Sequence, residues 1–121
     1  MTVAQTLGVV PNQFVLEHLP NSVFPEDDEW VALVRAPEGL TVVREAPPYV
    51  EADRWVGFYG GATAHSLDMP GMLAAIVVPL AEARVPVFVA STYHADLVLV
   101  PEHKLEVATA ALQDAGHKIQ P

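Results

Sequence analysis

Short apolar runs separated by turns make up the first half of the sequence. The runs span residues 14–19, 30–36 and 40–44 and are rich in Val, Leu and aromatic residues. The breaks at residues 20–22 and 37–39 contain Pro, Asn, Ser and Gly, which are residues that turns favour. This pattern predicts three β-strands.

Two segments of the second half repeat apolar residues at helical spacing. Residues 70–83 place an apolar stripe on one helix face, made of Leu73, Ile76, Val77 and Leu80. Pro79 lies inside this pattern, removes the backbone donor for the carbonyl of Ala75 and predicts a kink. A second helix opens at residues 101–102 and closes at Gly116, the usual residue at a left-handed helix end. Its apolar face comprises Leu105, Ala108, Leu112 and Ala115.

The remaining apolar runs of the second half are too short for helices. Residues 85–90 and 97–100 are continuous Val- and Leu-rich runs, typical of buried strands, and residues 55–59 form a strand that ends at a Gly-Gly pair. Residues 117–120 can add a last edge strand. The order is then strand, helix, strand, strand, helix, strand. It predicts an α/β (α+β) fold of the ferredoxin-like βαββαβ type, with both helices on one face of an antiparallel four-stranded sheet.

A Pro-Pro pair within residues 46–49 marks a seam between these two patterns. We therefore expect a β-rich half-domain at residues 1–50 and the βαββαβ domain at residues 51–121. A chain of 121 residues suits either one compact domain or two closely packed halves.

The composition narrows the functional classes. Apolar residues make up 51% of the chain and charged residues 17%, which indicates a globular protein. The net charge is -9, and the few basic residues are scattered, which argues against nucleic acid as a partner. The absence of cysteine excludes disulfides, thiolate metal sites and thiol nucleophiles. We see no signal-peptide pattern and no apolar run that could span a bilayer, so we expect a cytoplasmic protein without a membrane partner.

The most distinctive stretch lies within residues 87–100. It contains the motif Ser-Thr-Tyr-x-x-Asp at residues 91–96, which an apolar strand follows. This stretch resembles the small ACT-domain proteins that are related to the regulatory domain of aspartate kinases and to the CASTOR-type arginine sensors. The same resemblance extends to Trp55 and to residues 30–45, 66–73 and 79–83, and so covers most of the chain.

The resemblance implies a non-enzymatic regulatory protein that binds an amino acid, acts as an allosteric sensor and needs no cofactor. It also implies that the N-terminal strands form a second, degenerate ACT-like lobe and that two copies pair as a homodimer. In similar proteins the ligand lies between the loop after the first ACT strand and the loop joining the second and third strands, here residues 62–71 and 91–96. Arginine sensors carry a bulky aromatic residue at the position of Ala95, so this chain departs from them there.

The candidate ligand-binding residues lie in or beside these two loops. An amino acid presents a carboxylate and an ammonium group, so its site needs anion donors beside an acceptor. The N–H groups and the dipole of a helix start supply such donors near residues 68–73. The carboxylate of Asp68 or Asp96 can accept from the ammonium group. The candidates are Ser66, Leu67, Asp68, Gly71, Leu73, Ser91, Thr92, Tyr93 and Asp96.

These residues also have purely structural interpretations. Asp68 fits a helix N-cap, and Ser91, Thr92 and Asp96 can satisfy backbone groups in a turn. Tyr93 can belong to the core or to a dimer interface. On this alternative the chain is a structural or protein-interaction module of the same fold with a vestigial pocket.

Other chemistries find little support in the sequence. The histidines lack metal-ligand spacing, and the acidic residues 26–29 suit a solvated loop better than a metal site, so we expect no metal. We find neither a nucleophile elbow nor a phosphate-binding loop. A small enzyme would have to use Asp68 or Asp96 as a general base. The histidines that lack metal-ligand spacing are His18, His65, His94, His103 and His117.

Overall fold

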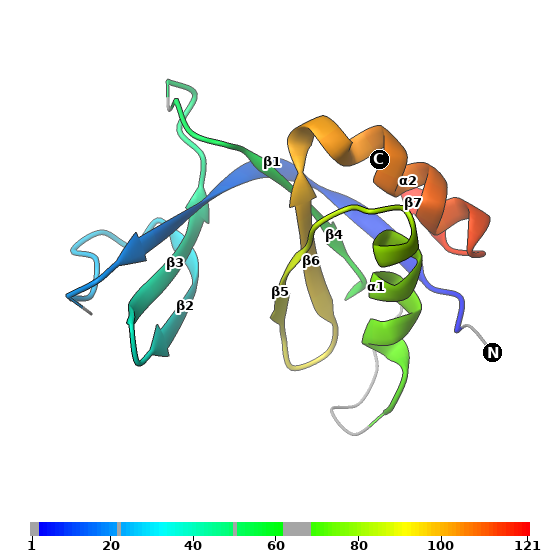
Figure 1. Cartoon of the computed structure of the whole chain (residues 1–121), viewed down its shortest axis with the longest axis horizontal. Helices are drawn as coiled ribbons and strands as arrows, with labels where there is room; N and C mark the ends of the chain where they lie inside the picture. Colours follow the sequence, from blue (N-terminus) through cyan, green and yellow to red (C-terminus); the bar gives the residue numbers. More distant parts are fainter. Residues whose placement is uncertain (1–2, 22, 50, 62–68) are drawn as a thin grey trace.

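The computed structural model describes residues 3–21, 23–49, 51–61 and 69–121. The strands are β1 (Thr6–Leu19), β2 (Trp30–Ala36), β3 (Gly39–Glu45), β4 (Trp55–Tyr59), β5 (Phe88–Ser91), β6 (Asp96–Pro101) and β7 (Lys118–Gln120). The helices are α1 (Met72–Glu82) and α2 (Leu105–Asp114), the latter preceded by a 3₁₀ turn at Glu102–Lys104. Figure 1 shows both helices in one part of the molecule and the β2–β3 hairpin extending away from them.

The long strand β1 lies at the centre of the sheet. The strand order is β2-β3-β1-β4-β6-β5, and β7 also pairs with β1. The second half of β1 pairs with β3 and, at Gln13 and Phe14, with β4, whereas its first half pairs with β4 and β7. β1 therefore joins the N-terminal hairpin to the part of the sheet that carries the helices (Figure 1).

A bulge at Pro11 separates the two halves of β1. Val9 faces Phe58 and Gln13 faces Val56, so three residues of β1 lie opposite Gly57 alone. Proline has no backbone donor for a sheet, and bulges are among the places where strands accommodate it. With this bulge, β1 continues as one strand from its pairing with β7 to its pairing with β3.

Most predicted elements are present. β2 and β4 have the bounds expected from the sequence, and both helices form. The largest errors in the predicted starts are those of β1, which begins at Thr6 and not at residue 14, and of β5, which begins at Phe88 and not at residue 85. In β1 the bulge breaks the alternating pattern, so the apolar residues before it do not show up in the sequence as part of the same strand.

The place of β7 differs from the expected antiparallel four-stranded sheet. β7 pairs in parallel with β1, through partners such as Leu7 and Ile119. Gly8 has partners in both β4 and β7, so β1 lies between these two strands. The protein is thus a mixed α+β fold in which a strand from the N-terminal part occupies a central place in the sheet.

The main core lies between the helices and the sheet. It comprises Leu7, Phe58, Ile76, Leu80, Val85, Val98, Val100, Ala108 and Leu112. A second cluster contains Phe14, Val43 and Leu99 together with half-buried Val10, Leu16, Trp55, Phe88 and Leu97. Gly57 is required in this second cluster because a Cβ there would lie 2.9 Å from Leu97 and 3.2 Å from Leu99.

A buried histidine connects the two ends of the chain to α1. The backbone N–H of Gln5 donates to Nδ1 of His117 at 3.0 Å, and Nε2 of His117 lies 2.6 Å from the carbonyl oxygen of Ala75. Because Nδ1 accepts, the proton of the neutral ring is on Nε2, which donates to Ala75. The side chain of Gln5 adds a bond of 2.8 Å to the carbonyl oxygen of Met72.

Pro79 explains why the carbonyl of Ala75 needs this partner. In an α-helix the carbonyl of residue 75 accepts from the N–H of residue 79, and proline has none. α1 nevertheless continues past Pro79 to Glu82. His117 supplies from another element the donor that the helix lacks, and its ring is only 4% exposed.

We expect His117→Phe to lower the free energy of unfolding by about 3 kcal/mol, because the Gln5 N–H and the Ala75 carbonyl then lose buried partners. In a Pro79→Ala background the new backbone N–H can donate to Ala75, so His117→Phe should cost less. Urea unfolding of the four proteins measures both costs. Equal costs in the two backgrounds would show that His117 and the N–H of residue 79 do not compete for the carbonyl oxygen of Ala75.

Ion pairs of Arg44 connect the segment between β1 and β2 to the sheet. Arg44 of β3 donates to Glu17 of β1 and, at 2.7 Å, to Oδ1 of Asp27. Asp27 also accepts from the backbone N–H of Glu29. The hydrogen bond from Arg44 and then that from Glu29 lower the pKa of Asp27. Residues 26–29 are all exposed, as expected for a solvated loop.

A lowered pKa means that Asp27 contributes stability above its ordinary pKa and loses that contribution as the pH falls through the lowered value. We expect Arg44→Gln to raise the titration midpoint of the Asp27 carboxyl group. NMR titration of the side-chain carboxyl carbons measures it, with Asp114 as an internal comparison. An unchanged Asp27 midpoint would show that Arg44 does not cause the shift.

Candidate functional site

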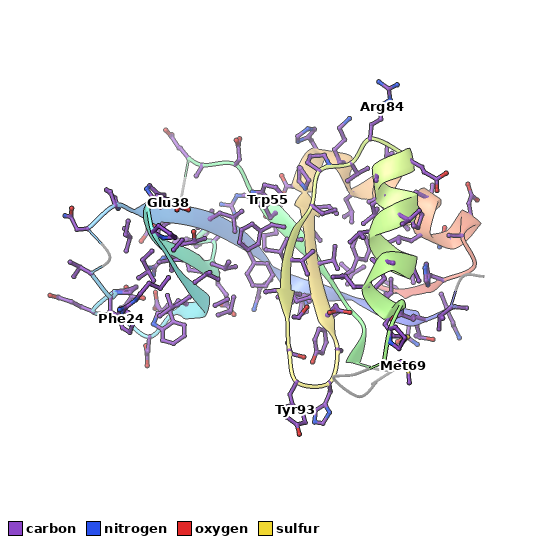
Figure 2. The ribbon with its side chains drawn as sticks, turned by 60° about the horizontal axis from the view of Figure 1, so that its bottom comes forward. Phe24, Glu38, Trp55, Met69, Arg84 and Tyr93 are labelled. Atoms are coloured by element: carbon purple, nitrogen blue, oxygen red, sulfur yellow. The ribbon has the colours of Figure 1, made fainter. Side chains whose placement is uncertain are left out.

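The candidate site lies at one end of the molecule, where β4 and β5 end and β6 begins. The loop of residues 92–95 joins β5 to β6, and Ser91 and Asp96 face each other at its base. Figure 2 shows Tyr93 at the tip of this hairpin and Met69, close to the start of α1, at the same end, whereas Arg84 marks the far end of that helix. In Figure 1 the hairpin tip and the start of α1 again share one end.

Thr92 closes the loop with its backbone and its side chain. Its backbone N–H donates to the carbonyl oxygen of Ala95 at 2.8 Å, and its hydroxyl donates to the same oxygen at 3.1 Å. The hydroxyl oxygen accepts from the N–H of Ala95, also at 3.1 Å. A threonine at this position therefore fixes the turn, as its structural interpretation predicted.

Tyr59 connects this loop to the end of β4. Its hydroxyl lies 3.3 Å from the hydroxyl oxygen of Thr92. The single proton of the Thr92 hydroxyl is used toward Ala95, so Tyr59 is the donor in this contact. Its own oxygen lone pairs remain as acceptors at the surface of the site.

Gly61 makes room for the Tyr59 ring. A Cβ at residue 61 would lie 2.5 Å from Cε2 of Tyr59, closer than such atoms can approach. The Gly-Gly pair that the sequence suggested as a strand end thus has a second role, which is to let the aromatic ring lie across the backbone.

Asp96 begins β6 as a buried carboxylate. Its residue is 5% exposed, and the hydroxyl of Ser91 donates to Oδ1 at 2.7 Å. The backbone N–H of Gly60 donates to its carbonyl oxygen at 3.3 Å. Asp96 therefore helps to hold the starts and ends of three strands together, whatever else it contacts.

α1 begins two residues after the start predicted from the sequence. Its N-cap is Gly71, whose φ of 85° is left-handed, and the first helical residue is Met72. Glycine is favoured there by this backbone conformation, since nothing lies within 4 Å of where a Cβ would be. Asp68, which the sequence offers as a helix N-cap, lies outside the described residues.

The structure brings several of the predicted site residues together and gives others a different environment. Ser91, Thr92 and Asp96 form the base of the loop, and Tyr93 is 71% exposed with its ring against that of His94. Leu73 is half-buried and packs on the main core. Ser66, Leu67 and Asp68 lie outside the described residues.

Sequence reasoning missed Tyr59 and the reason for Gly61. By local pattern, a tyrosine followed by two glycines indicates only a strand terminus. The contact with Thr92 depends on β4 and the β5–β6 loop meeting in space, which no local pattern indicates.

Two further findings concern the described residues as a whole. Within residues 3–21, 23–49, 51–61 and 69–121, no three His, Cys, Asp or Glu side chains come together as a metal site would require. None of the described helices has the length and apolar character that crossing a membrane demands.

The fold and this site define a mixed α+β protein with two helices beside a sheet and a polar loop at the strand ends. The sequence pattern of the ACT domain family matches residues 50–114, which is more than half of the chain. The protein therefore belongs to the ACT domain family. The match includes β4, both helices, β5 and β6.

Two solved structures are similar over nearly the whole chain. The X-ray structure of protein Atu0741 from Agobacterium tumefaciens has a TM-score of 0.81 at 24% identity and covers 98% of this chain and 93% of its own. Protein VC0802 from Vibrio cholerae, described as of unknown function and a possible transport protein, has a TM-score of 0.73 at 25% identity, with 97% and 91% covered. No curated protein matches the sequence. The N-terminal strands thus belong to the shared fold.

We expect Gly61→Ala to displace the Tyr59 ring and to break its bond to Thr92, at a cost of about 1 kcal/mol. Amide hydrogen exchange at Thr92 and Ala95 should then be faster. Tyr59→Phe should have the same effect on exchange, because it removes the donor alone. Gly8→Ala is the control, since a Cβ there meets only Tyr59 O at 3.9 Å. Unchanged exchange in both site variants would contradict the role of Tyr59.

Proposed function

We propose that this chain is a non-enzymatic regulatory protein that binds an amino acid between the β5–β6 loop and the start of α1. Membership of the ACT domain family supports the proposal, since these domains generally serve as modules for binding small molecules. The observation that carries it is the Tyr59–Thr92 contact, which holds the loop against the end of β4. The loop is thereby positioned at the same end of the protein as the first turn of α1 (Figure 2).

The start of α1 suits the carboxylate of such a ligand. The first N–H groups of an α-helix have no partner within the helix, and they favour an anion. Among the described residues, no side chain caps α1 at Gly71, and its first turn contains no acidic residue. A ligand carboxylate can therefore accept from these N–H groups without competition from a described carboxylate.

The opposite side of the proposed site supplies acceptors for an ammonium group. The Tyr59 oxygen and the carboxylate of Asp96 are the candidates there. Ser91 donates to Asp96 and so fixes the direction of that carboxylate. Charge-assisted bonds of this kind are stronger than neutral ones, which favours a zwitterion over an uncharged ligand.

The proposal includes several finer expectations. Ligand binding acts allosterically, the protein is a cytoplasmic homodimer, and β1–β3 form a degenerate ACT-like lobe, as in aspartate kinase regulatory domains and CASTOR-type sensors. Neither catalysis nor a cofactor is part of it. Ala95 is 1% exposed, so the bulky aromatic of the arginine sensors has no room at this position, and we propose an amino acid other than arginine.

A second candidate function is a protein-interaction module of the same fold. It is favoured by the half-buried apolar side chains of the second cluster, among them Trp55, Phe88 and Leu97, which pack away from the main core. Such a surface suits dimerisation or docking. This candidate needs no ligand at the β5–β6 loop.

A thermal-shift series with each of the twenty amino acids distinguishes the two. One amino acid at 100 times its dissociation constant should add about 2.7 kcal/mol of stability and raise Tm by several degrees. Asp96→Asn and Tyr59→Phe should reduce this shift, whereas Asp114→Asn, at the exposed end of α2, should leave it unchanged. A flat series from a folded protein that elutes as a dimer would support the interaction module instead.

A further inference from the structure

A cleft lies beside the β1 bulge. Along one edge of β1, the pairing with β7 ends at Gly8 and the pairing with β3 begins at Phe14. On this side, none of the described strands pairs with residues 9–12 of β1. The opening is bordered by α2 and has a volume of about 620 Å³. Figure 1 shows α2 beside the first half of β1. We call this opening the bulge cleft.

The bulge cleft has no charged side chain in its lining, although the chain has a net charge of -9. Its apolar surface comes from Val9, Val10, Pro11, Val56, Leu105, Ile119 and Pro121. Three uncharged polar side chains complete it, namely Gln13, Thr109 and Gln113. The lining side chains carry no charge that would compensate a charged ligand for its lost hydration, so they favour an uncharged one.

The polar groups of the lining come from two elements, α2 and β1. Thr109 and Gln113 follow Leu105 at intervals of four along α2, so all three share one face of the helix. Gln13 comes from β1, and Nη1 of Arg54 donates to its Oε1 at 3.2 Å. Because that bond occupies the amide oxygen, the NH₂ group of Gln13 is the part available to a ligand.

We propose that the bulge cleft is a second binding site, for an uncharged small molecule with an apolar body and a carbonyl group. The Gln13 amide donates to that carbonyl, and Thr109 and Gln113 accept or donate from α2. The volume lies in the range typical of small-molecule sites. This site is separate from the amino-acid site, because the β5–β6 loop precedes β6 and α2 follows it.

The test is an NMR titration of isotope-labelled protein with three probes of similar size. N-benzylacetamide is neutral, phenylpropionate is an anion and phenylpropylammonium is a cation. We expect saturable shifts of the backbone amides of residues 9–13 and 105–113 with N-benzylacetamide alone. Equal shifts with all three probes, or shifts that do not saturate, would overturn the proposal.

Two variants locate the binding. Thr109→Phe and Gln113→Phe each fill the cleft from α2, and either should abolish saturable binding of N-benzylacetamide. Ala110→Phe places the same side chain on the neighbouring, exposed position outside the lining and should preserve binding. If either folded lining variant still binds the probe, or Ala110→Phe also loses it, the site is elsewhere and the proposal fails. Thermal shifts by amino acids should persist in every variant, so failure of one site is distinguishable from failure of the other.

Discussion

Pairing along β1 holds the two parts of this protein together. Its first half forms hydrogen bonds with β4 on one side and with β7 on the other, and its second half pairs with β3 and, at Gln13 and Phe14, again with β4. A strand with partners on both sides cannot leave without exposing its own backbone groups and those of its neighbours. The N-terminal hairpin is therefore attached through the centre of the sheet and not through a flexible linker.

The buried Gln5–His117 contact completes this arrangement. β1 and β7 come from the two ends of the chain, and the ring of His117 joins both to the carbonyl of α1 that Pro79 leaves without a helical donor. A proline that weakens a helix locally is thus compatible with the fold because a residue distant in sequence satisfies the orphaned carbonyl. The His117 ring thus links α1 to both ends of the described chain, and the Gln5 side chain adds a second bond to α1.

Local sequence patterns predict those helices and strands correctly that are continuous and bury one face. They located β2, β4, both helices and the end of α2 near Gly116, because periodicity and end signals are local properties. They failed for the first half of β1, where Pro11 and Asn12-Gln13 interrupt the apolar run in the bulge. They located β7 but not its pairing, since nothing in a three-residue strand indicates which neighbour it will join or in which direction.

The same distinction separates the parts of the candidate site. Ser91, Thr92 and Asp96 lie within six residues and share one hairpin, so a motif could point to all of them. Tyr59 reaches Thr92 from another strand, and its position depends on the absence of a side chain at Gly61. Since Thr92 already uses its one proton within the loop, Tyr59 must donate and turn its acceptor lone pairs outward. The hydrogen bond from Thr92 to Ala95 inside the turn therefore determines that Tyr59 presents acceptors to a ligand, although neither Thr92 nor Ala95 has to contact that ligand.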